Sequence, residues 1–400
     1  MDIERIRADT PGCDSVVHFN NAGASPTPEP VHQAVLRHLD LERRIGGYAA
    51  QEAAAQDLAA FYTETAALIG AAPEEIAFTE NATRAWDMAF YGMTFAPGDR
   101  ILTHASEYVS NVLAMLQRAK TAGAQIDFAP SDATGQIDVA AMEAMITPAT
   151  RLIALTHVPT SGGLVNPAGD VGKIARRHNI SFLLDACQSV GQIDIDVGRI
   201  GCDMLCATGR KFLRGPRGTG FLYMRKGMIG RLEPPFLDLW AADWTAADAY
   251  EMQPTARRFE TFERNVAGQI GLTEAIRYAR TLGLPQIEAR ITALADDLRQ
   301  RLGALQGVHL HDTGARRCGI VTFTVEGEAA TETAVRLRRA GVMVSVTPRA
   351  YARIDFEERD LEAVVRASVH CFNDAGDLER LIDTAKGKTR SDVGGFGHAG

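Results

Sequence analysis

Two side chains with complementary chemistry follow two short apolar runs in the middle of the chain. The run Ile180–Leu184 ends in Asp185, and the run Asp203–Thr208 leads to Lys211. Short apolar runs of this kind are typical of buried parallel strands, and ligands gather at the carboxyl ends of such strands. The sequence therefore predicts an acid and an amine at one edge of a sheet.

This pair of residues suits pyridoxal 5'-phosphate. A lysine amine forms a Schiff base with its aldehyde, and a carboxylate opposite its pyridine nitrogen keeps that nitrogen protonated, which makes the ring an electron sink. Aspartates and lysines at strand ends are also common as caps and surface charges. A short motif of this kind therefore needs support from the rest of the chain.

Two further segments could hold the same cofactor. Residues 79–83 lead into a helix predicted from Arg84, so the amides around Ala82 and the hydroxyl of Thr83 could bind a phosphate. The same segment would also serve as a plain helix cap. Tyr108 follows a predicted strand and could stack on the ring, although a core aromatic explains a single tyrosine equally well.

Composition limits the class of protein. A chain of 400 residues with 46% hydrophobic and 23% charged residues is ordinary for a globular protein of about two domains. It contains no apolar run long enough to cross a membrane, and its charged N-terminus lacks a signal peptide, so we predict a cytoplasmic location. The net charge of −8 disfavours nucleic acid as a partner.

The six cysteines are scattered along the chain, which suits reduced thiols better than a disulfide framework. Cys202 and Cys206 are four residues apart, a spacing found in metal sites. No second pair of cysteines or histidines follows at ligand spacing, so we expect no metal.

Hydrophobic periodicity predicts the order of elements. Residues 1–25 are expected to form an extended N-terminal arm, and residues 26–250 a large domain in which strands and helices alternate around a mainly parallel sheet. Residues 251–386 suit a smaller α+β domain, and the polar, Gly-rich residues 387–400 a disordered tail. The expected strands are 100–104, 125–128, 152–157, 181–185, 203–207, 219–224, 308–310 and 318–325, and residues 234–248 are expected to form a loop.

The order and spacing of these motifs resemble the class V aminotransferase family of pyridoxal-phosphate enzymes. That family includes cysteine desulfurases, selenocysteine lyases, isopenicillin N epimerase-like proteins and hercynylcysteine sulfoxide lyases. The resemblance runs from FNNAGASP to RASVHCFN and is most specific in LLDACQSVGQIDIDV and ATGRKFLRGPRGTGFLY. It implies an α/β fold with an aspartate-aminotransferase-like large domain, a smaller α+β C-terminal domain, an amino-acid substrate and a homodimer.

The resemblance also implies roles for individual residues. Lys211 would be the Schiff-base lysine and proton shuttle, Asp185 the partner of the ring nitrogen, and Tyr108 the stacking residue. Gln188 would donate to the phenolic oxygen of the cofactor. The cofactor-binding set would be Ala82, Thr83, Tyr108, Thr160, Asp185, Gln188, Thr208, Arg210 and Lys211, with Thr83 and Arg210 at the phosphate. Arg366 would grip the substrate carboxylate, beside a turn formed by Asn21, Ala22 and Gly23.

The sequence departs from relatives at three places. Cysteine desulfurases need a mobile cysteine shortly before the carboxylate arginine, and no cysteine lies between Gly341 and Val365. Thr160 stands where many relatives have asparagine, which would leave more of the contact to the phenolic oxygen to Gln188. Glu263 replaces a threonine that in relatives reaches the partner subunit's phosphate, which puts an inter-subunit contact in question.

These departures disfavour a reaction in which a cysteine of the enzyme takes up sulfur as a persulfide. Reactions that need only the lysine remain. The predicted function is therefore a carbon-sulfur β-lyase acting on a cysteine conjugate, a choice that rests on Gly46, Gly47, Tyr48 and Tyr108, which resemble the sulfoxide-lyase branch. An aminotransferase or an amino-acid epimerase is the alternative. A non-catalytic scaffold is a remote third possibility.

Overall fold

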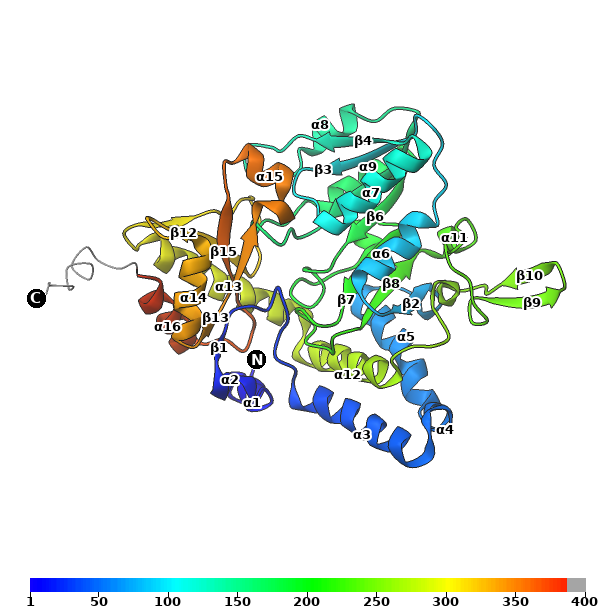
Figure 1. The fold of residues 1–400 in the computed structure, drawn as a ribbon, viewed down its shortest axis with the longest axis horizontal. Helices are drawn as coiled ribbons and strands as arrows, with labels where there is room; N and C mark the ends of the chain where they lie inside the picture. Colours follow the sequence, from blue (N-terminus) through cyan, green and yellow to red (C-terminus); the bar gives the residue numbers. More distant parts are fainter. Residues whose placement is uncertain (387–400) are drawn as a thin grey trace, which may run out of the picture.

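A sheet of seven strands forms the centre of the molecule, in the order β2-β8-β7-β6-β5-β3-β4. Every neighbouring pair is parallel except those made by β8, which runs antiparallel to β2 and β7. The sheet is therefore mainly parallel, as predicted. The computed structural model describes residues 1–386 (Figure 1). The strands are β2 (Ile76–Thr79), β3 (Arg100–His104), β4 (Gln125–Ala129), β5 (Thr150–Thr156), β6 (Ser181–Asp185), β7 (Met204–Thr208) and β8 (Gly220–Met224).

Strand β6 explains why this sheet needs helices on both faces. Phe182 and Leu184 pack into one apolar cluster and Leu183 into another, and all three are fully buried. Alternate side chains of a strand point to opposite faces, and burying each one contributes roughly 1.5–3 kcal/mol. One face is covered by α5 (Ala55–Ile69), α9 (Ala168–Arg177) and α12 (Val266–Leu282), and the other by α6 (Ala82–Tyr91) and α7 (Val109–Ala122).

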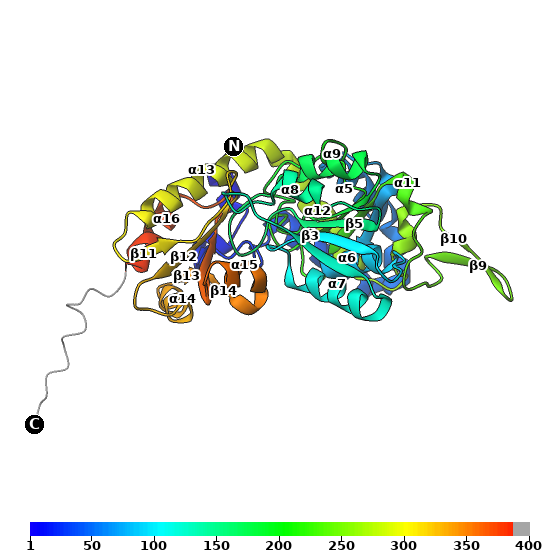
Figure 2. The ribbon, with the colours of Figure 1, turned by 90° about the horizontal axis from the view of Figure 1, so that it is seen from above.

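A second sheet has four antiparallel strands in the order β11-β12-β15-β14. Its strands are β11 (Val308–Leu310), β12 (Ile320–Val325), β14 (Ser345–Pro348) and β15 (Ala363–Ser368). Helices α13 (Leu284–Gly303) and α14 (Ala330–Arg339) pack on it, and α16 (Ala375–Ala385) packs on both helices (Figure 2). Helix α12, which precedes α13, instead packs against α3 (Glu29–Ile45) and α5. The domain boundary at residue 250 stays a prediction.

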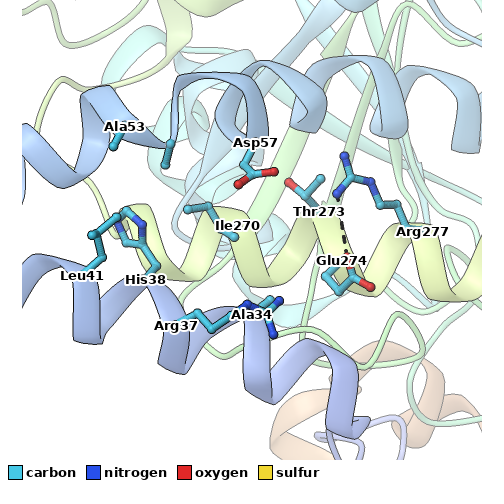
Figure 3. A pocket seen from close by; sticks show the side chains of 11 residues that line it. Ala34, Arg37, His38, Leu41, Ala53, Asp57, Ile270, Thr273, Glu274 and Arg277 are labelled. Atoms are coloured by element: carbon cyan, nitrogen blue, oxygen red, sulfur yellow. Dashed lines mark ion pairs between the residues drawn. The ribbon is translucent and has the colours of Figure 1, made fainter.

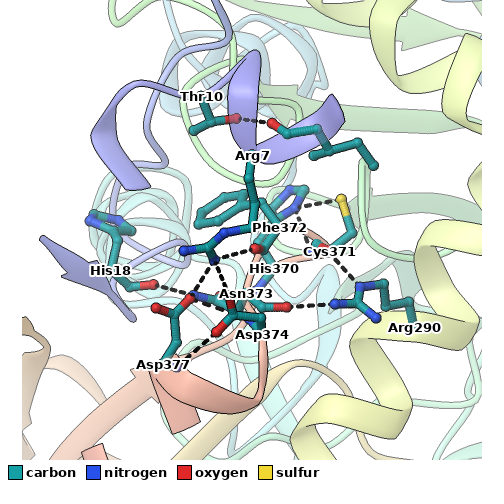
Figure 4. Close-up of polar contacts among 11 residues, drawn as sticks. Arg7, Thr10, His18, Arg290, His370, Cys371, Phe372, Asn373, Asp374 and Asp377 are labelled. Atoms are coloured by element: carbon teal, nitrogen blue, oxygen red, sulfur yellow. Dashed lines mark hydrogen bonds and ion pairs between the residues drawn. The ribbon is translucent and has the colours of Figure 1, made fainter. Parts of the chain in front are cut away.

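The N-terminal residues are not the extended arm that we expected. They form α1 (Ile3–Ala8) and α2 (Gly12–Ser15), because Asp2 caps α1 and Ile6 is buried. Strand β1 (Val17–His18) then pairs in parallel with β13 (Val342–Met343). Arg7 of α1 lies 3.1 Å from a carboxylate oxygen of Asp374 and 3.0 Å from one of Asp377 (Figure 4). The start of the chain is thus bound to β13 and to the first turn of α16.

The segment expected to be a loop, residues 234–248, contains β9 (Ala242–Ala246), which forms a hairpin with the following β10 (Ala249–Met252); the hairpin projects from the body of the molecule (Figures 1 and 2). Its Trp244 is 82% exposed. The short helices not yet named are α4 (Gly47–Ala53), α8 (Val139–Ala144), α10 (Val197–Ile200), α11 (Lys226–Ile229) and α15 (Arg353–Glu358). Among residues 1–386, no helix is both long and apolar enough to cross a membrane. The tail predicted to be disordered lies outside the described residues.

Candidate active site

A cavity opens at the carboxyl ends of β5, β6 and β7. Polar residues follow these strands in the chain. All nine residues predicted to bind the cofactor line the cavity. Four further residues, which sequence reasoning missed, line it as well: Asn81, Thr156, Val158 and Cys187. Parallel strands bring these residues together because their carboxyl ends meet at one edge of the sheet.

One wall of the cavity is the N-terminus of α6. The side chain of Asn81 caps this helix by accepting a hydrogen bond from Arg84 N at 2.9 Å. The amides of Ala82 and Thr83 lie in the first turn, where helix N–H groups have no partner within the helix. A Cβ on Gly220 would lie 3.1 Å from the carbonyl carbon of Asn81, so a glycine lets β8 approach this turn. A helix N-terminus with free amides of this kind can bind a phosphate, and this role of Ala82 and Thr83 stays a prediction.

The acid at the end of β6 is held from two sides. Asp185 is 4% exposed, and its Oδ1 accepts a hydrogen bond from Cys187 N and its Oδ2 one from Asn111 Nδ2, both at 2.9 Å. A carboxylate oxygen can accept two hydrogen bonds. Each oxygen of Asp185 therefore keeps acceptor capacity on its cavity side.

The amine comes from the loop after β7. Lys211 is 8% exposed, and burial lowers its pKa. The neighbouring guanidinium of Arg210 acts in the same direction, whereas the charge of Asp185 opposes it. A lower pKa gives more of the neutral amine near pH 7, and the neutral amine is the nucleophile.

The loop that carries Lys211 is supported from behind by His370. Nε2 of His370 bonds the carbonyl oxygen of Phe212 at 2.9 Å, and Nδ1 accepts a hydrogen bond from Cys371 N at 2.8 Å. Burial lowers the pKa of His370 to about 3, so the ring is neutral and carries its hydrogen on Nε2. The imidazole stacks on the rings of Phe212 and Phe372, and Figure 4 shows it beside Phe372. This packing fixes the backbone next to the amine.

A buried cation lies beside the cavity. Arg366, in β15, is 7% exposed and forms no ion pair within residues 1–386. Its Nη1 donates to Thr160 Oγ1, its Nη2 donates to Asn20 Oδ1 at 3.3 Å, and its Nε has no partner. Burial lowers the pKa of Arg366 to about 10, and Arg210 adds to the effect. The free Nε of this guanidinium can donate a hydrogen bond to an anion.

Thr160 links Arg366 to Gln188. Gln188 Nε2 donates to Thr160 Oγ1 at 2.9 Å and to the carbonyl oxygen of Ala22 at 3.0 Å, so both amide hydrogens are used. The Thr160 oxygen accepts from Gln188 and Arg366, which leaves the hydroxyl hydrogen to be donated. The hydroxyl of Thr160 is thus the free hydrogen-bond donor on this wall. From the sequence we expected Gln188 to donate to the phenolic oxygen of the cofactor.

The turn of Asn21, Ala22 and Gly23 stands behind the wall of the cavity. Asn21 Nδ2 donates to the carbonyl oxygen of Ser368 at 2.7 Å, and Arg210 Nη1 donates to that of Gly23. Neither these three residues nor Arg366 belong to the cavity lining. Their role as substrate ligands stays a prediction, and their observed contacts brace Gln188, Arg210 and β15.

A second cavity lies between α3, α5 and α12 (Figure 3). Its charged residues include Arg37, Asp57 and an ion pair of 3.7 Å between Arg277 and Glu274. Its lining contains no lysine, and histidine supplies its one aromatic ring. It therefore cannot carry the chemistry expected around Lys211.

Comparison with known families agrees with this geometry. A family model described as aminotransferase class V matches residues 17–381. The chain belongs to the class V aminotransferase family. It is a pyridoxal-phosphate-dependent enzyme, as that family is.

This class V enzyme has relatives along its whole length. It is 32% identical over 410 residues to a probable cysteine desulfurase of Xylella fastidiosa (strain Temecula1), covering 98% of this chain and 97% of the relative. It is 28% identical over 407 residues to a probable cysteine desulfurase of Methanothermobacter thermautotrophicus, covering 99% of each. The apo structure of the cysteine desulfurase of Thermococcus onnurineus NA1 has a TM-score of 0.90 at 29% identity, covering 96% of this chain and 98% of that one.

The residues of the cavity fit the cofactor. Its three chemical features are an aldehyde, a ring nitrogen and a phosphate, and the cavity offers an amine, a carboxylate and a helix N-terminus. The donor and acceptor sets match in kind, because Asp185 presents free acceptor capacity and Ala82 and Thr83 present amides. When bound, the cofactor withdraws electrons from the α-carbon of an amino acid.

Proposed function

We propose that this enzyme breaks the carbon-sulfur bond of an S-substituted cysteine by β-elimination. Lys211 holds the cofactor, Asp185 faces its ring nitrogen, and Tyr108 lies against the ring. Ala82, Thr83, Thr208 and Arg210 hold its phosphate end, and Thr160, supported by Gln188, donates to its phenolic oxygen. Loss of the α-proton and of the sulfur as a thiolate leaves 2-aminoacrylate, which water converts to pyruvate and ammonia.

The substrate carboxylate is assigned to Arg366. This guanidinium is buried without an acidic partner among the described residues, and burying an unpaired charge is costly. A carboxylate that bound Nε and one Nη would relieve that cost in a bidentate geometry. Because Thr160 contacts both Arg366 and Gln188, substrate binding is coupled to the wall that faces the phenolic oxygen.

The state of the cysteines is the observation that favours a lyase. The only thiol in the cavity lining is Cys187, and burial raises its pKa to about 12. The thiol therefore stays protonated near pH 7, and it is the thiolate that attacks sulfur. Cys318 and Cys371 are buried core residues, with pKa values raised to about 11 by burial.

The names of the relatives favour a second candidate, cysteine desulfurase. That reaction needs a cysteine to accept sulfur, and in this chain residues 341–365 contain none. They form β13, β14, a short 3-10 turn and α15 before reaching β15. Cysteine could be the substrate of either reaction, so the lyase and the desulfurase are distinguished by their products.

A product assay tests the proposal. The holoenzyme, given S-substituted cysteines without a keto acid, is expected to release pyruvate and ammonia in equal amounts. Alanine with sulfane sulfur as the products of cysteine would instead establish a desulfurase. A strict requirement for a keto-acid acceptor would establish an aminotransferase, and loss of optical purity without turnover an epimerase.

A homodimer is part of the proposal. Large apolar side chains are exposed on α3, α4 and the β9-β10 hairpin, including Leu39 at 46%, Tyr48 at 72% and Trp244 at 82%. Exposed apolar surface of this kind is typical of interaction sites. Sedimentation of the holoenzyme should give twice the chain mass, and a fully active monomer would contradict it. The cytoplasmic location stays a prediction.

A further inference from the structure

A second carboxylate lies behind the cavity and forms no ion pair in the described part of the chain. Glu107 follows β3 and is 5% exposed. Its Oε1 accepts hydrogen bonds from Tyr108 N and Asn111 Nδ2, both at 2.8 Å, and its Oε2 accepts one from Thr156 N at 2.8 Å. All three of these nitrogen groups donate a hydrogen bond to the Glu107 carboxylate. The hydroxyl of Thr156 also donates to Oε1, and all of these donors favour the ionised form of the carboxylate.

Asn111 joins this carboxylate to Asp185. Asn111 is 2% exposed, and its Nδ2 donates to Glu107 Oε1 at 2.8 Å and to Asp185 Oδ2 at 2.9 Å. An amide nitrogen carries two hydrogens, so each carboxylate takes one. Burial raises the pKa of Glu107 and the charge of Asp185 raises it further, whereas the hydrogen bonds from Thr156, Asn111 and Tyr108 oppose the rise and favour the charged form. Two like charges held this close are unfavourable unless a cation binds beside them.

Glu107 also arranges two walls of the cavity. It accepts the backbone N–H groups of Tyr108 and Thr156, and both residues line the cavity. One carboxylate therefore fixes the proposed stacking residue, the end of β5 and, through Asn111, the acid at the end of β6. A role limited to holding the backbone would affect the stability of the fold and leave the charge state of a bound ring unchanged.

We propose that Glu107 is a positioning residue for the reaction: through Asn111 it orients Asp185, and its negative charge favours the proton on the cofactor's ring nitrogen. The proposal rests on the role given to Asp185 in the proposed function. Glu107 does not touch the cavity itself, and it acts through Asn111 and through its electrostatic field. Together the two carboxylates make the ring a stronger electron sink than one would.

The test is Glu107→Gln in the holoenzyme, which removes the charge and keeps the size of the side chain. The ring-nitrogen NMR signal of isotopically labelled cofactor should move toward the unprotonated position, corresponding to a fall of about one unit in the pKa of that nitrogen. Exchange of the substrate α-proton with deuterated water should slow about tenfold. The thermal unfolding of the apoenzyme serves as a separate measure of structural damage.

Two further variants distinguish an effect of the Glu107 charge from an effect of losing a hydrogen bond. Thr103→Val removes only a contact of 3.3 Å to Glu107 Oε2 and keeps the charge, so its NMR signal should match the wild type. Asn111→Ala breaks the link to Asp185 while Glu107 stays charged, and it should shift the signal by less than Glu107→Gln. If Glu107→Gln does not fold, Asn111→Ala decides: a shifted signal supports the proposal and an unshifted one overturns it.

Failure of this proposal is distinguishable from failure of the proposed function. A wild-type enzyme whose bound cofactor has an unprotonated ring nitrogen would overturn the role of Asp185, and this inference with it. A wild-type enzyme with a protonated ring nitrogen, together with a folded Glu107→Gln that has the same signal and exchange rate, would overturn this inference alone.

Discussion

Replacing Lys211 by alanine is expected to abolish turnover and to release the cofactor. Lys211 is the only lysine in the cavity lining, and burial lowers the pKa of its amine. The variant loses both the covalent attachment and the group that moves the α-proton. The second loss alone amounts to about 10²–10⁴ in rate. Borohydride should fix the cofactor to the wild type, and the variant should lose its visible absorption on gel filtration.

The control for this experiment is Lys173→Ala, because Lys173 lies on the outer surface of α9 with its side chain 66% exposed in an ion pair with Asp170. It should retain cofactor and activity. A Lys211→Ala variant that turned over substrate at the wild-type rate would refute the assignment of the amine.

Replacing Asp185 by asparagine is expected to have the next largest effect. The side chain keeps its size but loses the charge that would pair with a protonated ring nitrogen. Breaking one half of a buried pair costs about 3–5 kcal/mol, which corresponds to a loss of at least about 10²-fold in the rate of α-proton removal. The measurement is deuterium exchange at the α-carbon, together with the NMR signal of the ring nitrogen.

Asp203 offers a matched control, because its side chain is also largely buried and lies at the start of β7, outside the cavity. It accepts hydrogen bonds from Phe182 N and Arg225 Nε. Asp203→Asn should lower the unfolding temperature and leave α-exchange in the folded holoenzyme close to that of the wild type. Equal losses in both variants would mean that the effect of Asp185→Asn is structural.

The central fold could be predicted because buried strands have a strong local signal. The runs that end at His104, Asp185 and Thr208 are short, apolar and bounded by polar turns, and they became β3, β6 and β7. Helix α12 has a similarly local signal, because apolar residues recur at helical spacing along Val266–Leu282. Residues 3–8 and 242–246 were mispredicted, since a short helix and a strand of an exposed hairpin leave little periodicity to detect.

The cavity residues could be predicted only in part. The amine, the acid and the helix N-terminus carry motifs, and the lining includes them all. Glu107 and Asn111 carry no motif of their own, although a polar pair four residues apart beside a core strand is a signal that could have been followed. The contacts of Thr160 and Arg366 join β15 to the loop after β5, and a single sequence does not reveal such long-range hydrogen bonds.

The pairing of β1 with β13 has a consequence for how the chain folds during synthesis. Val17 is made well before Val342, yet they are neighbours in one ladder. Domains fold as units while the ribosome elongates the chain. The central sheet can assemble early, but α1 and β1 must wait for β13 and for Asp374 and Asp377. Helix α1 and strand β1 therefore reach their final positions only after β13 and Asp377 are made, although they precede the central sheet in the chain.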